Sequence, residues 1–228
     1  MKTWLKISLG IWITMVLGLG VAMPIGYIPG LGSKARIIFF HVPMSWLAVV
    51  AFFMAMWYGI VYLRKREIKY DIKSSAAAEL GFIFSVLATI TGSIWAKFNW
   101  GSFWNWDPRE TSIFVLLLIY GAYFSLRSAI EVEERRASLS AVYSIVAFVT
   151  VPFFVFIMPR IMFSLHPGGG GSPAPIVNSN GKMYLDMNMR YVFYASLLGF
   201  TVLYVWLFQL RTKVALLAYS KEIRSGGQ

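Results

Sequence analysis

Residues 39–63 read FFHVPMSWLAVVAFFMAMWYGIVYL, a run without lysine, arginine, aspartate or glutamate. An α-helix rises about 1.5 Å per residue, so about 20 apolar residues cross the roughly 30 Å hydrocarbon layer of a bilayer. This stretch therefore predicts a transmembrane helix, and five other stretches are long and apolar enough to predict the same. The six predicted helices are Leu5–Tyr27, Phe39–Leu63, Ala76–Trp95, Ser112–Leu126, Leu139–Met158 and Tyr191–Leu210.

The composition of the 228-residue chain is typical of a protein that lies in lipid. Hydrophobic residues make up 58% of it and charged residues 14%, and the mean hydropathy is +0.64, which excludes an ordinary soluble domain. The first apolar stretch is long and no small-residue cleavage pattern follows it, so we expect a retained helix and not a signal peptide. The prediction is an all-α, multi-pass membrane protein with one domain over residues 1–228.

The basic residues predict the orientation of the helices, because lysine and arginine in short loops stay on the cytoplasmic side during insertion. Of the 21 basic residues, 14 fall on the side of the two termini, and seven fall on the side of the predicted loops 96–111 and 159–190. Those seven are Lys34, Arg36, Lys97, Arg109, Arg160, Lys182 and Arg190. Both termini are therefore expected in the cytoplasm and the two loops at the periplasmic face. This topology accounts for the net charge of +11 without nucleic-acid binding.

The loops differ in character. The cytoplasmic connections Arg64–Ser75 and Arg127–Ser138 are short and carry charges of both signs, so we expect them to be solvated. In the long outer loop, residues 166–175 read HPGGGGSPAP, which excludes a continuous helix there. The chain has no cysteine, so it can form neither a disulfide nor a thiolate metal site.

The most informative motif is the run WGSFWNWDPRET at residues 100–111. Tryptophan gathers at membrane interfaces because its ring is largely apolar while its N–H needs a partner, so one or two would only mark the headgroup level. Trp100, Trp104 and Trp106 together favour a flat aromatic shelf that suits a large planar amphipathic ligand. Haem is such a ligand.

The chain has only two histidines, His41 and His166, and the predicted topology places both on the side of the tryptophan run. Neutral imidazole is a good axial ligand of haem iron, because its unperturbed pKa of about 6.5 leaves a ring nitrogen free to donate at physiological pH. A lone histidine at this position is more often a hydrogen-bonded interfacial residue than a ligand. As a pair, the two could occupy both axial positions of one haem.

The last residues of the motif predict the N-terminus of a helix. Asp107 followed by Pro108 and Glu110 predicts an N-cap, a proline at the first helical position and a capping box. Arg109 follows the tryptophans directly, and its planar guanidinium matches a haem propionate. Arg36 and Arg160 are weaker candidates for the same role, and a lipid headgroup contact is an alternative for all three.

The stretch Trp100–Thr111 resembles the tryptophan-rich "WWD" signature of the haem-handling protein family of cytochrome c biogenesis. The stretch His41–Trp46 is similar to the first flanking-histidine motif of that family, and Leu165–Pro167 stands where the second is expected. Among the family members, six helices and two histidines resemble the haem exporter or delivery component of the cytochrome c maturation system. The resemblance implies that His41 and His166 are the axial metal ligands. It also implies that Trp100, Gly101, Trp104, Trp106, Asp107 and Arg109 belong to the haem-contacting loop.

The resemblance further implies a protein of the bacterial inner membrane that binds b-type haem transiently, without a covalent bond, at the periplasmic face. It would deliver haem to a periplasmic haem chaperone, in a complex with the two ABC-transporter subunits and a small membrane subunit of the same system. It is not expected to be an enzyme alone, although it would assist covalent attachment of haem to the chaperone. The stretch Gly168–Gly171 is not expected from the family pattern, and we hypothesise that it lets His166 swing away during release.

Two other functions are alternatives. A bis-histidine, cytochrome b-like electron-transfer protein that moves electrons across the membrane needs about two histidine pairs at different depths, whereas this chain has two histidines in all. A solute transporter needs polar or ionisable residues near mid-membrane, and few are found here.

Overall fold

The computed structural model describes residues 2–26, 28, 31–167, 176 and 183–226. Within this part of the chain the protein is helical and contains no strand. The helices are α1 (Thr3–Ala22), α2 (His41–Lys65), α3 (Ile68–Trp100), α4 (Pro108–Ala129), α5 (Glu133–Pro152), α6 (Met158–Ile161) and α7 (Met187–Gly226). A 3-10 helix (Gly32–Phe39) precedes α2, and a π-helical turn (Phe153–Ile157) joins α5 to α6. Six helical segments are long and apolar enough to cross a membrane, which confirms the all-α, six-helix prediction.

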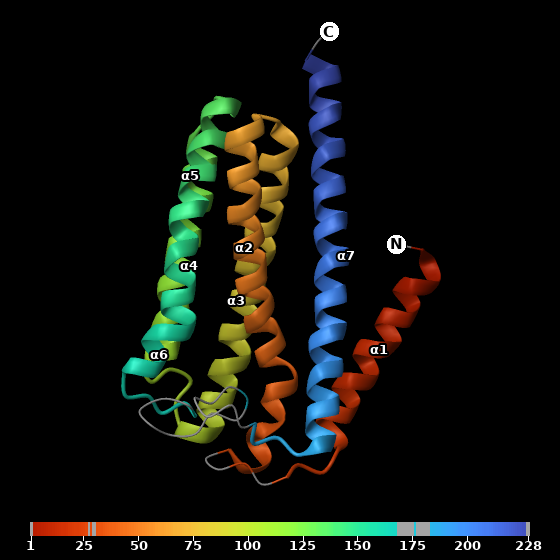
Figure 1. Ribbon diagram of the computed structural model, residues 1–228, viewed down its shortest axis with the longest axis vertical. Coiled ribbons are helices and arrows are strands. Elements are labelled where there is room, and N and C mark those ends of the chain that lie inside the picture. Colours follow the sequence, from red (N-terminus) through yellow and green to blue (C-terminus); the bar gives the residue numbers. More distant parts are fainter. Residues whose placement is uncertain (1, 27, 29–30, 168–175, 177–182, 227–228) are drawn as a thin grey trace.

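The helices α2, α3, α4 and α5 form a bundle, and α7 runs beside α2 and α3 (Figure 1). Helix α1 leans against one half of α7, where the Trp12 indole N–H donates to the carbonyl of Ala195 at 3.0 Å. We call the end that carries residues 101–107 and 162–167 the site end. The end that carries the α2–α3 and α4–α5 turns is called the opposite end (Figure 1). The C-terminal part of α7 extends past the other helices at the opposite end.

Several helix boundaries differ from the prediction. Helix α3 begins at Ile68 and not near Ala76, so the expected solvated loop Arg64–Ser75 shrinks to the two non-helical residues Arg66 and Glu67. Arg66 adopts a left-handed conformation, with φ of 57°, and ends α2. Helix α7 continues to Gly226, well past the predicted end at Leu210. The predictions followed the apolar stretches, but helical hydrogen bonding continues into polar sequence beyond a bilayer's thickness.

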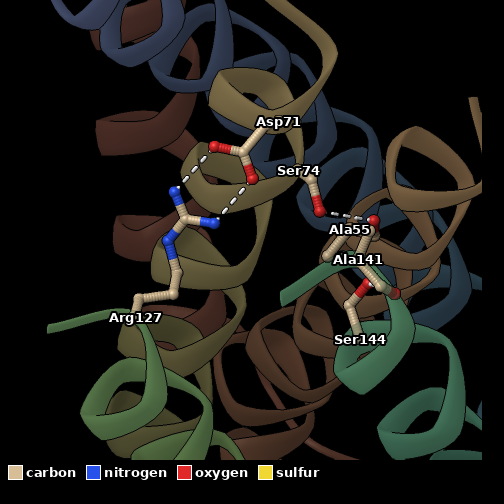
Figure 2. Close-up of polar contacts among 6 residues, drawn as sticks. All are labelled: Ala55, Asp71, Ser74, Arg127, Ala141 and Ser144. Atoms are coloured by element: carbon tan, nitrogen blue, oxygen red, sulfur yellow. Dashed lines mark hydrogen bonds and ion pairs between the residues drawn. The ribbon is translucent and has the colours of Figure 1, made fainter. Parts of the chain in front are cut away.

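The expectation that both cytoplasmic connections are solvated is wrong for two charged residues. The buried Asp71 and the partly buried Arg127 form a bidentate ion pair between α3 and α4, with Nη1–Oδ1 and Nη2–Oδ2 distances of 2.6 and 2.9 Å (Figure 2). Planar guanidinium and carboxylate groups match each other in this geometry, so each charge is satisfied away from water. The pair ties the two helices together at the opposite end.

Small residues bring α2 close to α3 and α5 at the same end. A Cβ added at Gly59 of α2 would lie 2.7 Å from the Ser144 hydroxyl oxygen and 3.2 Å from the Ala141 carbonyl oxygen of α5. Ser74 of α3 donates to the carbonyl of Ala55 at 2.8 Å (Figure 2). Without a hydrophobic driving force in lipid, such close backbone approach and interhelical hydrogen bonds hold helices together. Nearer the middle, the Phe52 ring stacks on Tyr120 at a centroid distance of 3.6 Å.

Candidate functional site

A cavity of about 520 Å³ opens at the site end, between the first turns of α2, the last turns of α3 and the start of α4. Both histidines line it, as do Trp100, Trp104 and Arg109. The cavity reaches inward as far as Phe52, and its walls are mostly apolar. Its volume falls within the range of small-molecule and cofactor sites, and apolar walls with a few polar groups are typical of them.

His41 is the first residue of α2, and its position is fixed by α3. Its Nδ1 lies 3.1 Å from the Thr91 hydroxyl oxygen. That hydroxyl donates its single hydrogen to the carbonyl of Leu87 or Ala88, at 2.8 and 3.1 Å, so its oxygen is the acceptor toward the imidazole. Nδ1 therefore carries the proton, and Nε2 keeps its lone pair. Metal-binding histidines are usually held in this way by a partner on the other ring nitrogen.

The close contact between α3 and the His41 ring depends on a glycine. A Cβ added at Gly92 would lie 3.0 Å from Cε1 of His41, which is tighter than an ordinary contact. Thr91 and Gly92 thus act together, because one binds the imidazole and the other leaves room for it. The sequence analysis missed both. A threonine–glycine pair inside an apolar predicted helix is the signal that could have indicated them.

His166 lies in the non-helical segment that follows α6. Its Nδ1 is 3.0 Å from the Pro167 carbonyl oxygen, and since a carbonyl can only accept, Nδ1 carries the proton here too. The ring packs against Trp95 and Trp100, at centroid distances of 5.8 and 6.4 Å. Burial, and then the positive charge of Arg109, lower the pKa of His166 to about 3, so its imidazole is neutral at physiological pH. The neighbouring stretch Gly168–Gly171 lies outside the described residues.

The tryptophans of the 100–106 run face different ways. Trp100 and Trp104 line the cavity, whereas Trp106 is 70% exposed and is not part of the wall. Its backbone has a φ of 55°, a conformation that costs a bulky residue free energy. Gly101 is also outside the wall, and with a φ of 84° it ends α3. Trp95 joins the wall from within α3 and was missed because it lies inside a predicted transmembrane helix.

The predicted capping box at Asp107 is confirmed. The Asp107 carboxylate accepts from the Arg109 N–H at 3.0 Å, and the Glu110 carboxylate accepts from the Asp107 N–H at 3.2 Å. Asp107 is buried and also accepts hydrogen bonds from Ser164 and Leu165, in the segment that carries His166. Sequence spacing gives no sign of this second contact, because 57 residues separate Asp107 from Ser164.

Two cations line the cavity. Arg109 and Arg160 both do so, and the Arg109 Nε is buried without a hydrogen-bond partner in the described part of the chain. Arg36 does not line it, since its guanidinium donates to the carbonyls of Gly20 and Met23 at 3.2 and 2.7 Å. The cavity therefore combines apolar walls and two imidazoles with the guanidinium groups of Arg109 and Arg160 and the carboxylates of Asp107 and Glu110. Among the described residues, no group of three or more histidine, aspartate or glutamate side chains is placed to hold a bare metal ion.

Comparisons with known proteins show which family this chain resembles. Residues 1–225 match the family model described as "Heme exporter protein C". The heme exporter protein C of Paracoccus denitrificans is 32% identical over 182 residues, which are 80% of this chain and 73% of that protein. The proteins of the same name from Bradyrhizobium diazoefficiens and Escherichia coli are 31% and 28% identical, over 77% and 96% of this chain. The aligned parts span 64% and 86% of those two relatives, so the chain covers just under two thirds of the Bradyrhizobium protein.

Proposed function

Because the chain belongs to the heme exporter protein C family, we propose that it binds one haem in the cavity at the site end during haem export for cytochrome c maturation. His41 and His166 are the axial ligands in this proposal. The observation that carries it is that both imidazoles line one cavity with Nδ1 occupied, which leaves both Nε2 atoms free to bind iron. Two imidazoles suit a haem, since the porphyrin supplies the other four ligands of the iron.

The remaining wall of the cavity fits the rest of the haem molecule. Apolar and aromatic side chains would cover the macrocycle, with Trp100 and Trp104 among them. Arg109 is the preferred partner of a propionate because its Nε has no partner among the described residues and its guanidinium matches a carboxylate. Arg160 lines the same cavity and is the second candidate. Arg36 is not proposed, because its guanidinium already binds two backbone carbonyls.

Delivery requires that haem leave the protein, and the exposed Trp106 is the proposed contact for the recipient. Its indole lies 5.8 Å, centroid to centroid, from that of the cavity-lining Trp104, so it is next to the cavity wall while most of its own surface is exposed. Tryptophan is enriched among residues that dominate binding at protein interfaces. The recipient is expected to be the periplasmic haem chaperone, with the site end at the periplasmic face of the bacterial inner membrane. The two ABC-transporter subunits and the small membrane subunit are the other expected partners.

The test is an absorption spectrum of the purified full-length protein after addition of ferric haem. We expect a low-spin, bis-imidazole spectrum that is lost in His41→Ala and in His166→Ala. Trp57→Ala, an exposed position on α2 outside the cavity wall, serves as the control and should keep the wild-type spectrum. An unchanged spectrum in both histidine variants would remove these residues from the site. A cytochrome b-like function, which needs about two such pairs, would require more than one haem per chain.

The role of Trp106 is tested separately. Trp106→Ala should keep the bis-imidazole spectrum and slow haem transfer to the purified chaperone, because only the outward contact is removed. Trp104→Ala should instead weaken haem binding itself. Transfer at the wild-type rate from Trp106→Ala would exclude this residue as a contact for the recipient.

A further inference from the structure

We propose that Asp107 and Ser164 are positioning residues that hold His166 at the haem iron. The inference deepens the proposed function and rests on it. Its basis is a set of hydrogen bonds that joins the start of α4 to the segment carrying His166. The Asp107 Oδ2 accepts from the Ser164 hydroxyl at 2.8 Å and from the Leu165 N–H at 2.7 Å. The Ser164 hydroxyl oxygen in turn accepts from the His166 N–H at 3.1 Å.

These bonds are the polar attachment of the segment. Residues 162–167 are not helical, so they have no regular backbone hydrogen bonding to fix their path. Among the described residues, the hydrogen bonds that link 163–166 to residues outside the segment 162–167 all end on Asp107. Asp107 and Ser164 are only 4% and 8% exposed, so water competes little for the same groups. Hydrogen bonds to a carboxylate are about twice as strong as neutral ones. Asp107 therefore sets where the His166 backbone lies.

The carboxylate itself is rigidly placed. Its Oδ1 accepts from the Arg109 N–H at 3.0 Å as the cap of α4, and α4 packs in the helical bundle. The two functions of Asp107 use largely different oxygens, since Leu165 binds Oδ2 and the helix cap uses Oδ1. One side chain thus joins the second axial ligand to a helix that starts at the cavity wall. The backbone of His41 needs no such attachment, because His41 is already part of helix α2.

The two oxygens allow the capping and positioning roles to be separated. The Asp107→Asn variant would still cap α4, because asparagine caps helices about as well as aspartate. The new amide group would place N–H donors against the N–H of Leu165, so the hydrogen bond to Leu165 would be lost, while Ser164 could still donate to Oδ1, which lies 3.0 Å away. Ser164→Ala removes the hydroxyl that donates to Asp107 and accepts from the His166 N–H, and it leaves the cap untouched. Ser125→Ala is the matched control, since it removes an exposed helix hydroxyl that bonds only within α4.

The experiment uses the full chain in detergent with ferric haem, followed by absorption and electron paramagnetic resonance spectra. Wild type and Ser125→Ala should be low-spin. Asp107→Asn and Ser164→Ala should retain haem through His41 but show a high-spin fraction. Their haem affinity should fall by about 10- to 100-fold, as for other groups that orient a metal ligand. Added imidazole should restore the low-spin spectrum by replacing the displaced His166 ring.

The outcomes separate this inference from the proposed function. If both variants keep the wild-type spectrum and affinity while His166→Ala loses them, the positioning role is wrong and the haem site stands. If His166→Ala itself keeps the wild-type spectrum, the proposed function fails. A high-spin Ser164→Ala protein that imidazole does not restore would also contradict the inference, since it would indicate general damage to the cavity. Because Ser164→Ala leaves the cap intact, it still tests the positioning role if Asp107→Asn lowers the yield of folded protein.

Discussion

The two ends of the helical bundle are built on different principles. At the opposite end, small residues such as Gly59 and Ala141 bring the helices into direct contact, and a buried Asp71–Arg127 pair joins two of them. At the site end the same helices enclose a cavity of about 520 Å³ lined by aromatic, cationic and imidazole groups. Among α2, α3, α4 and α5, the opposite end provides close packing, and the site end leaves part of that packing out to make room for a ligand.

Helix α3 carries two glycines that serve different contacts, Gly81 near the middle of the bundle and Gly92 at the site end. A Cβ at Gly81 would meet the Phe52 ring at 2.6 Å, whereas a Cβ at Gly92 would meet the His41 imidazole at 3.0 Å. The first glycine permits two helices to pack, and the second permits a candidate metal ligand to fit. Substitutions at the opposite end should therefore change stability and leave haem binding intact. Substitutions at the site end should weaken haem binding and leave stability largely unchanged.

The largest expected effect is at the buried ion pair. Arg127→Ala leaves the Asp71 carboxylate buried without a partner and should lower the free energy of unfolding by about 3–5 kcal/mol. Unfolding by sodium dodecyl sulfate in mixed micelles measures this change. The double variant Asp71→Leu/Arg127→Met is the control and should recover most of the loss, because no unpaired charge remains. Wild-type stability of Arg127→Ala would mean that the pair contributes nothing to the opposite end.

The second effect is at the α2–α5 contact. Gly59→Ala places a methyl group 2.7 Å from the Ser144 hydroxyl oxygen and should cost about 1–3 kcal/mol of stability as the helices move apart. Gly121→Ala on α4 is the matched control, because a Cβ there meets nothing within 4 Å. Adding Ser144→Ala to Gly59→Ala should recover part of the loss. Equal stability of the Gly59 and Gly121 variants would show that the contact is not close-packed.

The fold could be predicted well from the sequence, because the main physical constraint on the fold, the bilayer, leaves a clear pattern in the sequence. A bilayer requires long apolar helices, and stretches such as Phe39–Leu63 satisfy that requirement residue by residue. The helix ends were less accurate, since α3 and α7 continue into polar sequence that no bilayer rule covers. The burial of Asp71 could not be predicted either. Its partner Arg127 lies 56 residues away, and charge alone suggests a solvated position.

The candidate site was predicted in part for a similar reason. Both histidines, Trp100 and Trp104 belong to distinctive residue types in one motif-bearing region, and the Asp107 cap follows a local four-residue pattern. Contacts between distant segments were not visible, as with Thr91 beside His41 and Ser164 beside Asp107. Nor could the sequence distinguish the inward Trp104 from the outward Trp106, because a turn with positive φ decides their directions. Local motifs could therefore be predicted from this sequence, whereas the contacts between distant segments became known only from the structure.

The third effect tests the site end. Thr91→Val keeps the shape of the side chain but removes the acceptor of the His41 Nδ1–H, and should weaken haem binding by about 10- to 100-fold. A haem titration followed by absorbance measures the affinity. Thr150→Val is the control, because the Thr150 hydroxyl donates only to Ala147 of its own helix. Thr91→Ser should bind as wild type does, and equal affinity of the two valine variants would remove Thr91 from the support of His41.

The smallest effect gives the sharpest comparison between the ends, because it repeats one chemical change at both. Gly92→Ala moves a methyl group to 3.0 Å from Cε1 of His41, so the imidazole must shift by a few tenths of an ångström. The strain of about 0.5–1.5 kcal/mol should weaken haem binding roughly 2- to 12-fold while stability without haem changes little. Gly59→Ala should instead lower stability and leave haem affinity unchanged. If Gly92→Ala instead lowered stability and left haem affinity unchanged, the site end would be packed like the opposite end. Its glycine would then serve helix contact and not the imidazole.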